Sequence, residues 1–169
     1  DHIKLVCMMG PAGTGKTLLA LASGLQKVVE EKIYERMVVA RPIVPMGKDI
    51  GYLPGSKEEK LQNWMQPITD NLDFLFAQGK EEAYAYVQEQ GIIEVEALTY
   101  IRGRSLPKCF MIIDEAQNLS PHEVKTIVTR VGEGTKIIFT GDPFQIDHQY
   151  LDEFSNGLSY LAQRFLNEK

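Results

Sequence analysis

The stretch Gly10-Pro11-Ala12-Gly13-Thr14-Gly15-Lys16-Thr17 decides the fold, because it matches the phosphate-binding pattern Gly-x-x-x-x-Gly-Lys-Ser/Thr. An apolar run over residues 3–9 precedes it and predicts a buried strand, and a helical pattern follows it from Lys16. The glycines let backbone N–H groups point at phosphate oxygens, and the positive end of the following helix favours the same anions. Lys16 is expected to reach the outer phosphates, and the Thr17 hydroxyl to hold Mg²⁺. The chain is therefore predicted to bind a nucleoside triphosphate.

The rest of the chain predicts strands and helices in alternation. Further strands are expected at residues 37–40, 92–98, 110–113 and 136–140, and helices at residues 16–31, 57–76, 80–90 and 121–131. Pro67 should kink or break the second helix, whose apolar side chains could lie in the core or face a partner, with the core favoured. Ser120 and Glu123 form a capping-box signature. This alternation predicts an α/β fold with a parallel sheet between helical layers.

Length and composition indicate one globular domain over residues 1–169. Hydrophobic residues make up 44% of the chain and charged residues 24%, which is typical of a protein with a sizeable core. The net charge of −5 means that any contact with nucleic acid must come from a local basic patch. Cys7 and Cys109 are expected in buried strands, as packing residues rather than as a disulfide. No apolar run approaches the roughly 18 residues of a membrane span, so a cytoplasmic location without membrane contact is expected.

An acidic pair follows the apolar run at residues 110–113. Ligands of an open parallel sheet bind at the carboxyl ends of the strands, where we expect Gly10, Arg41, Asp114, Glu115, Thr140 and Asp142. Asp114 is predicted to hold Mg²⁺ through water, and Glu115 to act as the general base that polarises the attacking water. The chain carries no Asn-Lys-x-Asp run for guanine recognition, which favours ATP over GTP.

Hydrolysis of the terminal phosphate usually also needs an arginine from a moving or neighbouring element. The candidates are Arg130, which ends the helix after the acidic pair, and Arg41, Arg102 and Arg104 at other strand ends or loops. Arg130 is the candidate for a finger that acts across a subunit boundary, although a surface arginine on a helix is commonly just solvated.

Motifs beyond the phosphate loop carry a resemblance to a known family. Asp114-Glu115-Ala116-Gln117 and Gly141-Asp142-Pro143-Phe144-Gln145 resemble motifs of superfamily-one helicase cores. The stretches at residues 41–47, 51–55, 98–105 and 151–158 resemble those of the PhoH-like ATPase family, and the likeness covers nearly the whole chain. Residues 150–158 are most similar to the subgroup that carries an N-terminal PIN ribonuclease domain.

The resemblance implies a P-loop NTPase of RecA-like, three-layer αβα architecture, in which the Thr140 strand lies between the phosphate-loop strand and the Asp114 strand. It also implies ATP hydrolysis, a homo-oligomeric ring, with a hexamer expected, and unwinding of single-stranded RNA or its delivery to a PIN domain of the same protein. By the same likeness Gln145 would sense the terminal phosphate, and Asp142 would belong to the nucleotide site. Arg41, Arg102 and Arg104 would lie near the nucleic-acid path or a neighbouring subunit.

Two departures from the family pattern bear on activity. The chain has no room for the second RecA-like domain that closes over ATP in superfamily-one helicases, so closure is expected from another subunit. It begins at Asp1 without Met, and no further strand with a Gly-Glu-Arg-Ser-like stretch follows Lys169, so we expect an excised C-terminal ATPase domain. A nucleotide-binding scaffold with little turnover and a small-molecule phosphotransferase remain alternatives.

Overall fold

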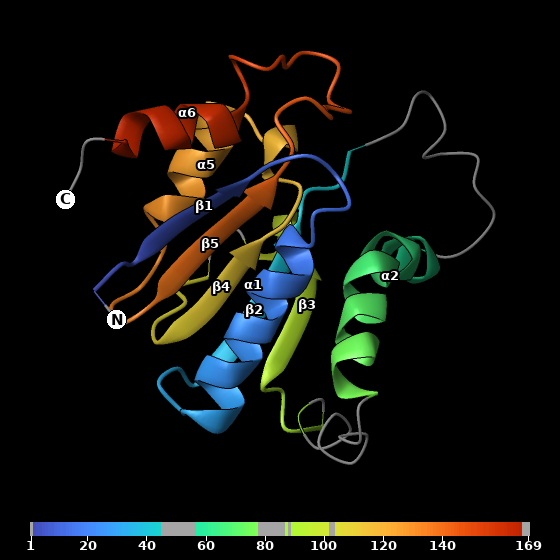
Figure 1. The fold of residues 1–169 in the computed structure, drawn as a ribbon, viewed down its shortest axis with the longest axis vertical. Coiled ribbons are helices and arrows are strands. Elements are labelled where there is room, and N and C mark those ends of the chain that lie inside the picture. The colour runs from blue at the N-terminus through green and yellow to red at the C-terminus, as the bar shows by residue number, and fades with distance from the viewer. Residues whose placement is uncertain (1, 45–56, 78–86, 88, 102–103, 167–169) are drawn as a thin grey trace.

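A five-stranded, fully parallel sheet forms the centre of the molecule (Figure 1). The computed structural model of the chain describes residues 2–44, 57–77, 87, 89–101 and 104–166. In chain order the strands are β1 (Leu5–Met9), β2 (Arg36–Arg41), β3 (Ile93–Ala97), β4 (Cys109–Ile113) and β5 (Lys136–Gly141). In space their order is β1-β5-β4-β2-β3. The α/β prediction is confirmed, and so is the position of the Thr140 strand between the phosphate-loop strand and the Asp114 strand.

Helices cover both faces of the sheet and complete three layers (Figure 1). One face is covered by α1 (Lys16–Leu25) and α2 (Lys57–Phe76). The other face packs against the short α4 (Leu98–Ile101), the 3₁₀ turn η3 (Ala116–Asn118), α5 (Pro121–Val128) and α6 (Gly157–Phe165). Since parallel strands are joined by crossovers, this layering buries both sides of the sheet.

The helix boundaries differ from the sequence prediction in several places. After α1 the chain continues as a π-helical turn, η1 (Gln26–Glu30), and α5 ends at Val128 rather than at Val131. Val131 instead makes an isolated bridge with Leu106. α2 is one helix with Pro67 inside it, and Leu98, predicted as the end of a strand, instead begins α4. The helix expected at residues 80–90 lies mostly outside the described residues.

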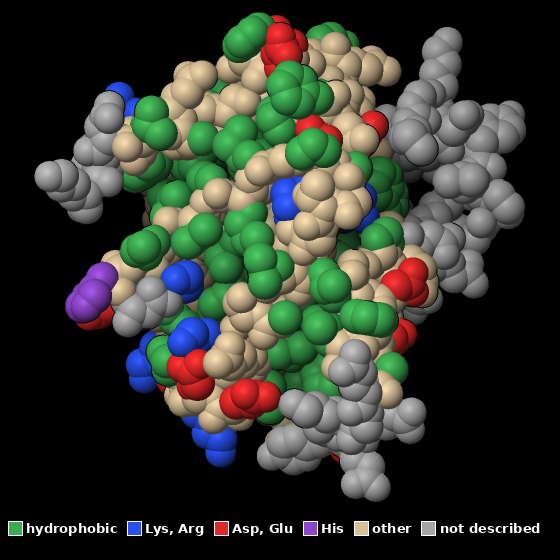
Figure 2. All heavy atoms as spheres, viewed as in Figure 1, with side chains coloured by type: hydrophobic (Ala, Val, Ile, Leu, Met, Phe, Trp, Pro, Cys, Tyr) green, Lys and Arg blue, Asp and Glu red, His purple; other side chains and the backbone are tan. Residues whose placement is uncertain are grey.

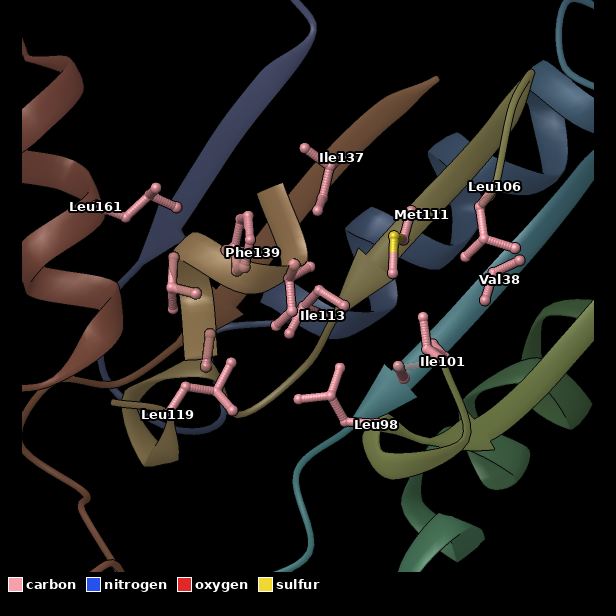
Figure 3. Packing of buried hydrophobic residues seen from close by; sticks show 14 of the residues in the cluster. Val38, Leu98, Ile101, Leu106, Met111, Ile113, Leu119, Ile137, Phe139 and Leu161 are labelled. Atoms are coloured by element: carbon pink, nitrogen blue, oxygen red, sulfur yellow. The ribbon is translucent and has the colours of Figure 1, made fainter. Parts of the chain in front are cut away.

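Two apolar clusters hold the layers together, one on each side of the sheet. Strand pleating sends Val38 and Ala40 to the α5 and α6 side, and Met37 and Val39 to the α1 and α2 side. Figure 3 shows the first cluster, in which Phe139 of β5 and Ile113 of β4 pack near Leu119 and Leu161. Each fully buried side chain of this kind contributes about 1.5–3 kcal/mol. These clusters fix the strand order, and with it the positions of the strand ends.

The surface is mixed in character. On the described part of the face in Figure 2, acidic and basic side chains are interspersed at the lower left, and apolar side chains are prominent over the upper part. Among the helices that the structure describes, none is long and apolar enough to span a membrane. Cys7 and Cys109 are both free thiols, as expected, and burial raises the pKa of Cys7 to about 11.

Candidate nucleotide site

The loop between β1 and α1 has the backbone of a phosphate cradle. Gly13 and Gly15 have φ angles of 74° and 80°, a region that residues with a Cβ rarely enter. Gly15 is the N-cap of α1, so the N–H groups of the loop lie at the positive end of that helix. The Lys16 ammonium lies over the loop and donates to the carbonyl oxygens of Gly10 and Pro11, at 2.7 Å each. The Lys16 ammonium therefore lies within the phosphate-binding loop, as the motif predicts.

Asp114 joins three neighbouring elements at the carboxyl edge of the sheet. Its side chain is buried, and its Oδ1 accepts hydrogen bonds from Thr17 Oγ1 at 2.7 Å and from Thr140 Oγ1 at 2.6 Å. Thr17 is the second residue of α1, Thr140 is the last but one residue of β5, and Asp114 follows β4, so the strand order β1-β5-β4 is what brings them together. The predicted pair of Thr17 and Asp114 is thus in contact.

This oxygen-rich corner fits Mg²⁺, which prefers hard oxygen ligands and keeps several waters. Thr17 Oγ1 is the oxygen that would hold the ion directly, and Asp114 would hold it through water. No group of three or more His, Cys, Asp or Glu side chains in the described ranges could hold a metal by itself. A magnesium ion here would therefore depend on the phosphates of a bound nucleotide.

Glu115 has a strained backbone next to this corner. Its φ and ψ of 54° and 39° lie in the left-handed region, which costs a non-glycine residue of order 1–3 kcal/mol and is commonest at functional sites. Its carboxylate accepts a hydrogen bond from Gln117 Nε2 through Oε2 and lies 3.4 Å from Arg41 Nη2 through Oε1. Both oxygens of the predicted general base are therefore held in place.

The buried amide of Gln117 connects the acidic pair to the loop after β5. Besides Glu115, its Nε2 donates to the carbonyl of Gln145 at 2.9 Å, and its Oε1 accepts from the N–H of Asp142 at 3.2 Å. A Cβ at Gly141 would collide with Gln117 Oε1, so glycine stands there because the amide needs the space. The Asp142 carboxylate in turn accepts from the N–H groups of Ala12 and Phe144, at 3.1 and 3.0 Å.

These groups line one open cleft of about 340 Å³. Its walls are Ala12, Gly13, Gly15, Lys16, Thr17, Leu18, Asn71, Asp114, Glu115, Gly141, Asp142 and Gln145. The cleft thus gathers most of the predicted phosphate loop, the acidic pair, Asp142 and Gln145. Asn71 comes from α2, which places that helix at the rim.

The three candidate arginines that the structure describes are not among the residues that line this cleft. Arg41 contacts the Glu115 carboxylate, and Arg102 lies outside the described residues. Arg104 is held by the carboxylates of Glu94 and Glu96, and the hydrogen bond to Glu94 is the main cause that raises its pKa.

Arg130 follows α5, and its neighbour Val131 makes the bridge with Leu106, which precedes β4, so this part of the chain lies toward the edge where the strands begin. Arg130 is not among the residues that line the cleft of its own chain. Its predicted role across a subunit boundary stays a prediction.

The sequence placed Thr140 at a strand end and Gln117 in a motif, but it assigned no role in the site to either residue. Both are polar and fully buried, and both stand beside residues that it did single out. A polar residue inside or directly after an apolar strand is the signal that could have found them, because a buried polar group needs a partner.

The parallel order β1-β5-β4, the glycine cradle and the Thr17–Asp114 contact define the class of protein: a P-loop nucleotide-binding protein of the α/β type. The family model for PhoH, described as "PhoH-like protein", matches residues 1–169. The chain therefore belongs to the PhoH family, a P-loop ATPase-like family. Membership supports nucleotide binding and nucleotide hydrolysis as the class of activity.

Curated relatives agree with this assignment. "Protein PhoH2" of Bacillus subtilis is 64% identical over 166 residues, which are 98% of this chain and 38% of the relative. "Protein PhoH2" of Mycolicibacterium smegmatis is 40% identical over 149 residues, 88% of this chain and 33% of the relative. A "PhoH-like protein" of Bacillus subtilis is 42% identical over 144 residues, 85% of this chain and 44% of the relative. The chain thus spans less than half the length of these relatives.

Proposed function

We propose that this chain binds ATP with Mg²⁺ and hydrolyses it, as the ATPase part of an oligomeric protein that remodels single-stranded RNA. The observation that carries the hydrolytic part is the Glu115 carboxylate, which lines the same cleft as the phosphate loop and Thr17. A carboxylate at this place suits activation of the water that attacks the terminal phosphate. RNA remodelling is supported by the likeness of the Asp114–Gln117 and Gly141–Gln145 motifs to superfamily-one helicase cores.

The residues of this chain divide the work of hydrolysis. The amides of the loop and the Lys16 ammonium bind the phosphate oxygens, and Lys16 exchanges its bonds to Gly10 and Pro11 for bonds to phosphate. Magnesium, when bound, neutralises part of the phosphate charge. Glu115 takes the proton of the attacking water, and its two carboxylate oxygens contact Gln117 and Arg41. Gln145, which lines the same cleft, would report on the terminal phosphate.

The central experiment measures phosphate release by the 169-residue chain with and without single-stranded RNA, alongside its native mass. Three proteins are compared: the natural chain, Lys16→Ala and Glu115→Gln. We expect Lys16→Ala to lose most of its ATP affinity, because a charged contact to phosphate is lost. Glu115→Gln should keep ATP affinity and lose turnover by a factor of about 10²–10⁴. Undiminished phosphate release by Glu115→Gln would reject the hydrolytic assignment.

The RNA, ring and partner parts of the proposal have their own readouts. RNA should accelerate phosphate release, and replacing Arg102 and Arg104 by Ala should reduce that acceleration more than the basal rate. A native mass of six chains would match the expected hexamer. Binding without turnover at any mass would indicate the scaffold alternative, and phosphate transfer to a small acceptor in place of water would indicate the phosphotransferase. In the whole protein, a PIN ribonuclease domain is the expected neighbour of this one.

A further inference from the structure

Arg41 is the last residue of β2, and the pleat of the strand decides where its side chain goes. Met37 and Val39 belong to the cluster on the α1 and α2 side, and Arg41 continues their alternation on the same side. β2 pairs with β4, with Ala40 opposite Ile113, and the N–H of Asp114 donates to the Ala40 carbonyl. Arg41 therefore lies beside the acidic pair and beneath α2.

The guanidinium of Arg41 bridges these two neighbours. Nη2 lies 3.4 Å from Glu115 Oε1, and Nη1 donates to the Trp64 carbonyl of α2 at 3.4 Å. The guanidinium carbon also stands 5.8 Å from the centre of the Trp64 ring, within cation–π range. The side chain is only 17% exposed, and Nε is buried without a hydrogen-bond partner among the described residues. A planar group of five donors that is mostly buried is suited to hold other groups in place.

We propose that Arg41 is a positioning residue for Glu115 and that it links the orientation of this carboxylate to helix α2 through Trp64. The inference rests on the proposed hydrolytic function, in which Glu115 must present a lone pair to the attacking water. Arg41 holds Oε1 while Gln117 holds Oε2, so the carboxylate plane is fixed at both ends. Glu115 itself has a strained backbone, and the orientation of its carboxylate depends on these two partners.

The link to α2 follows from how that helix is anchored. Met65, next to Trp64, and Ile68 and Leu72 further along α2 are buried in the same cluster as Met37 and Val39 of β2. Asn71 of α2 also lines the nucleotide cleft. A shift of α2 would therefore move Trp64 against Arg41, and the carboxylate of Glu115 would follow. Burial in this position favours the carboxylate over an RNA phosphate as the partner of Arg41.

The chain offers both a reporter and a matched control. Trp64 is the single tryptophan of the sequence, so intrinsic emission at tryptophan wavelengths reports on its surroundings. Arg36 begins the same strand, and its guanidinium pairs with Glu94, away from the cleft. Arg36→Ala thus removes the same type of side chain from the same strand without touching Glu115.

The experiment compares Arg41→Ala, Arg41→Lys and Arg36→Ala with the natural chain in turnover, nucleotide affinity by calorimetry and Trp64 emission. Arg41→Ala should lower kcat by a factor of about 10–100 and change the Kd for a non-cleavable ATP analogue by less than about threefold. Arg41→Lys should recover only part of the loss, because an ammonium lacks the flat fork that spans Glu115 and Trp64. Arg36→Ala should keep the natural kcat.

Emission tests the link independently of turnover. Glu115→Gln should change Trp64 emission in the natural background and leave it unchanged in the Arg41→Ala background, because the signal passes through Arg41. The emission measurement tests the link between Glu115, Arg41 and Trp64 even if the natural chain releases no phosphate. Absence of phosphate release would reject only the proposed function. A natural kcat in Arg41→Ala, or a loss of RNA affinity at an unchanged basal kcat, would overturn the positioning role. Equal emission responses to Glu115→Gln in both backgrounds would overturn the link to α2.

Discussion

Gly141→Ala is the substitution for which the structure gives the sharpest expectation. The new Cβ would overlap Gln117 Oε1 and come within 2.8 Å of Leu158 Cδ2. The φ angle of Gly141 is not positive, so alanine meets no backbone penalty there and the effect is one of space. The Gln117 amide must leave its position and give up its bonds to Glu115, Gln145 and Asp142.

The magnitude follows from these three bonds. Each contributes about 1 kcal/mol net, so Gly141→Ala should destabilise the fold by about 3 kcal/mol. Gln117→Ala removes the same bonds and leaves a small cavity, which makes its cost about 3–4 kcal/mol. Because the bonds can be lost only once, the double variant should cost about 4 kcal/mol. The coupling energy is therefore about 2–3 kcal/mol in magnitude, far above what independent sites show.

Urea unfolding followed by far-ultraviolet circular dichroism measures all four free energies of unfolding, with m-values compared to check two-state behaviour. Gly24→Ala is the control, because its Cβ would meet Met37 and Phe110 on the α1 side and has no part in the Gln117 network. Its cost should add to that of Gln117→Ala within about 0.5 kcal/mol. Additive costs for Gly141→Ala and Gln117→Ala would refute the reasoning, since the two changes would then act on separate interactions.

Three further outcomes are expected. Thr17→Val should raise the Mg²⁺ concentration needed for half-maximal nucleotide binding by about tenfold, while Thr17→Ser stays near the natural value; equal requirements in both variants would remove the hydroxyl from the metal site. Ser120→Ala should lower the free energy of unfolding by about 1 kcal/mol in urea titrations, because the Ser120 and Glu123 capping box of α5 is lost. Burial raises the pKa of Cys7 to about 11, so its thiol should stay protonated at pH 8 and react with iodoacetamide far more slowly than in the urea-unfolded chain, as peptide mapping would show; equal rates would contradict this.

Local pattern predicted the site where its residues are close in sequence. The cradle from Gly10 to Thr17 and the pair Asp114 and Glu115 could be assigned because each depends on one strand and the turn after it. The contact between Thr17 and Asp114 needed the strand order as well, and the family resemblance supplied that order. Site residues that directly follow a strand can therefore be predicted from the sequence before the fold is known.

The rest could not be read because it depends on partners that lie far apart in sequence. Gln117 acquires its role from Asp142 and Gln145, and Arg41 from Trp64 and Glu115. Nothing in the sequence around Arg41 distinguishes a guanidinium under a helix from one beside nucleic acid. The π-helical turn at Gln26–Glu30 is likewise a local adjustment that the 3.6-residue period of α1 does not announce.

The positions of the arginines decide which of them could act as an arginine finger on the terminal phosphate of a bound nucleotide. Among the described residues, Arg41 is committed to Glu115 and Trp64, and Arg104 to Glu94 and Glu96. Arg130 is not among the residues that line the cleft, and its neighbour Val131 pairs with Leu106, which precedes β4. An arginine finger at Arg130 therefore requires a second copy whose strand-start edge faces the strand-end edge of the first. Such a contact joins two different surfaces, so it repeats head to tail and closes into a ring when the rotation between copies allows.

Mixing Lys16→Ala with Arg130→Ala tests this geometry. Each variant alone should be inactive. Their mixture should regain phosphate release, because some interfaces then pair an intact phosphate loop with an intact arginine. A mixture as inactive as its components, with oligomers present by native mass, would rule out Arg130 as the finger.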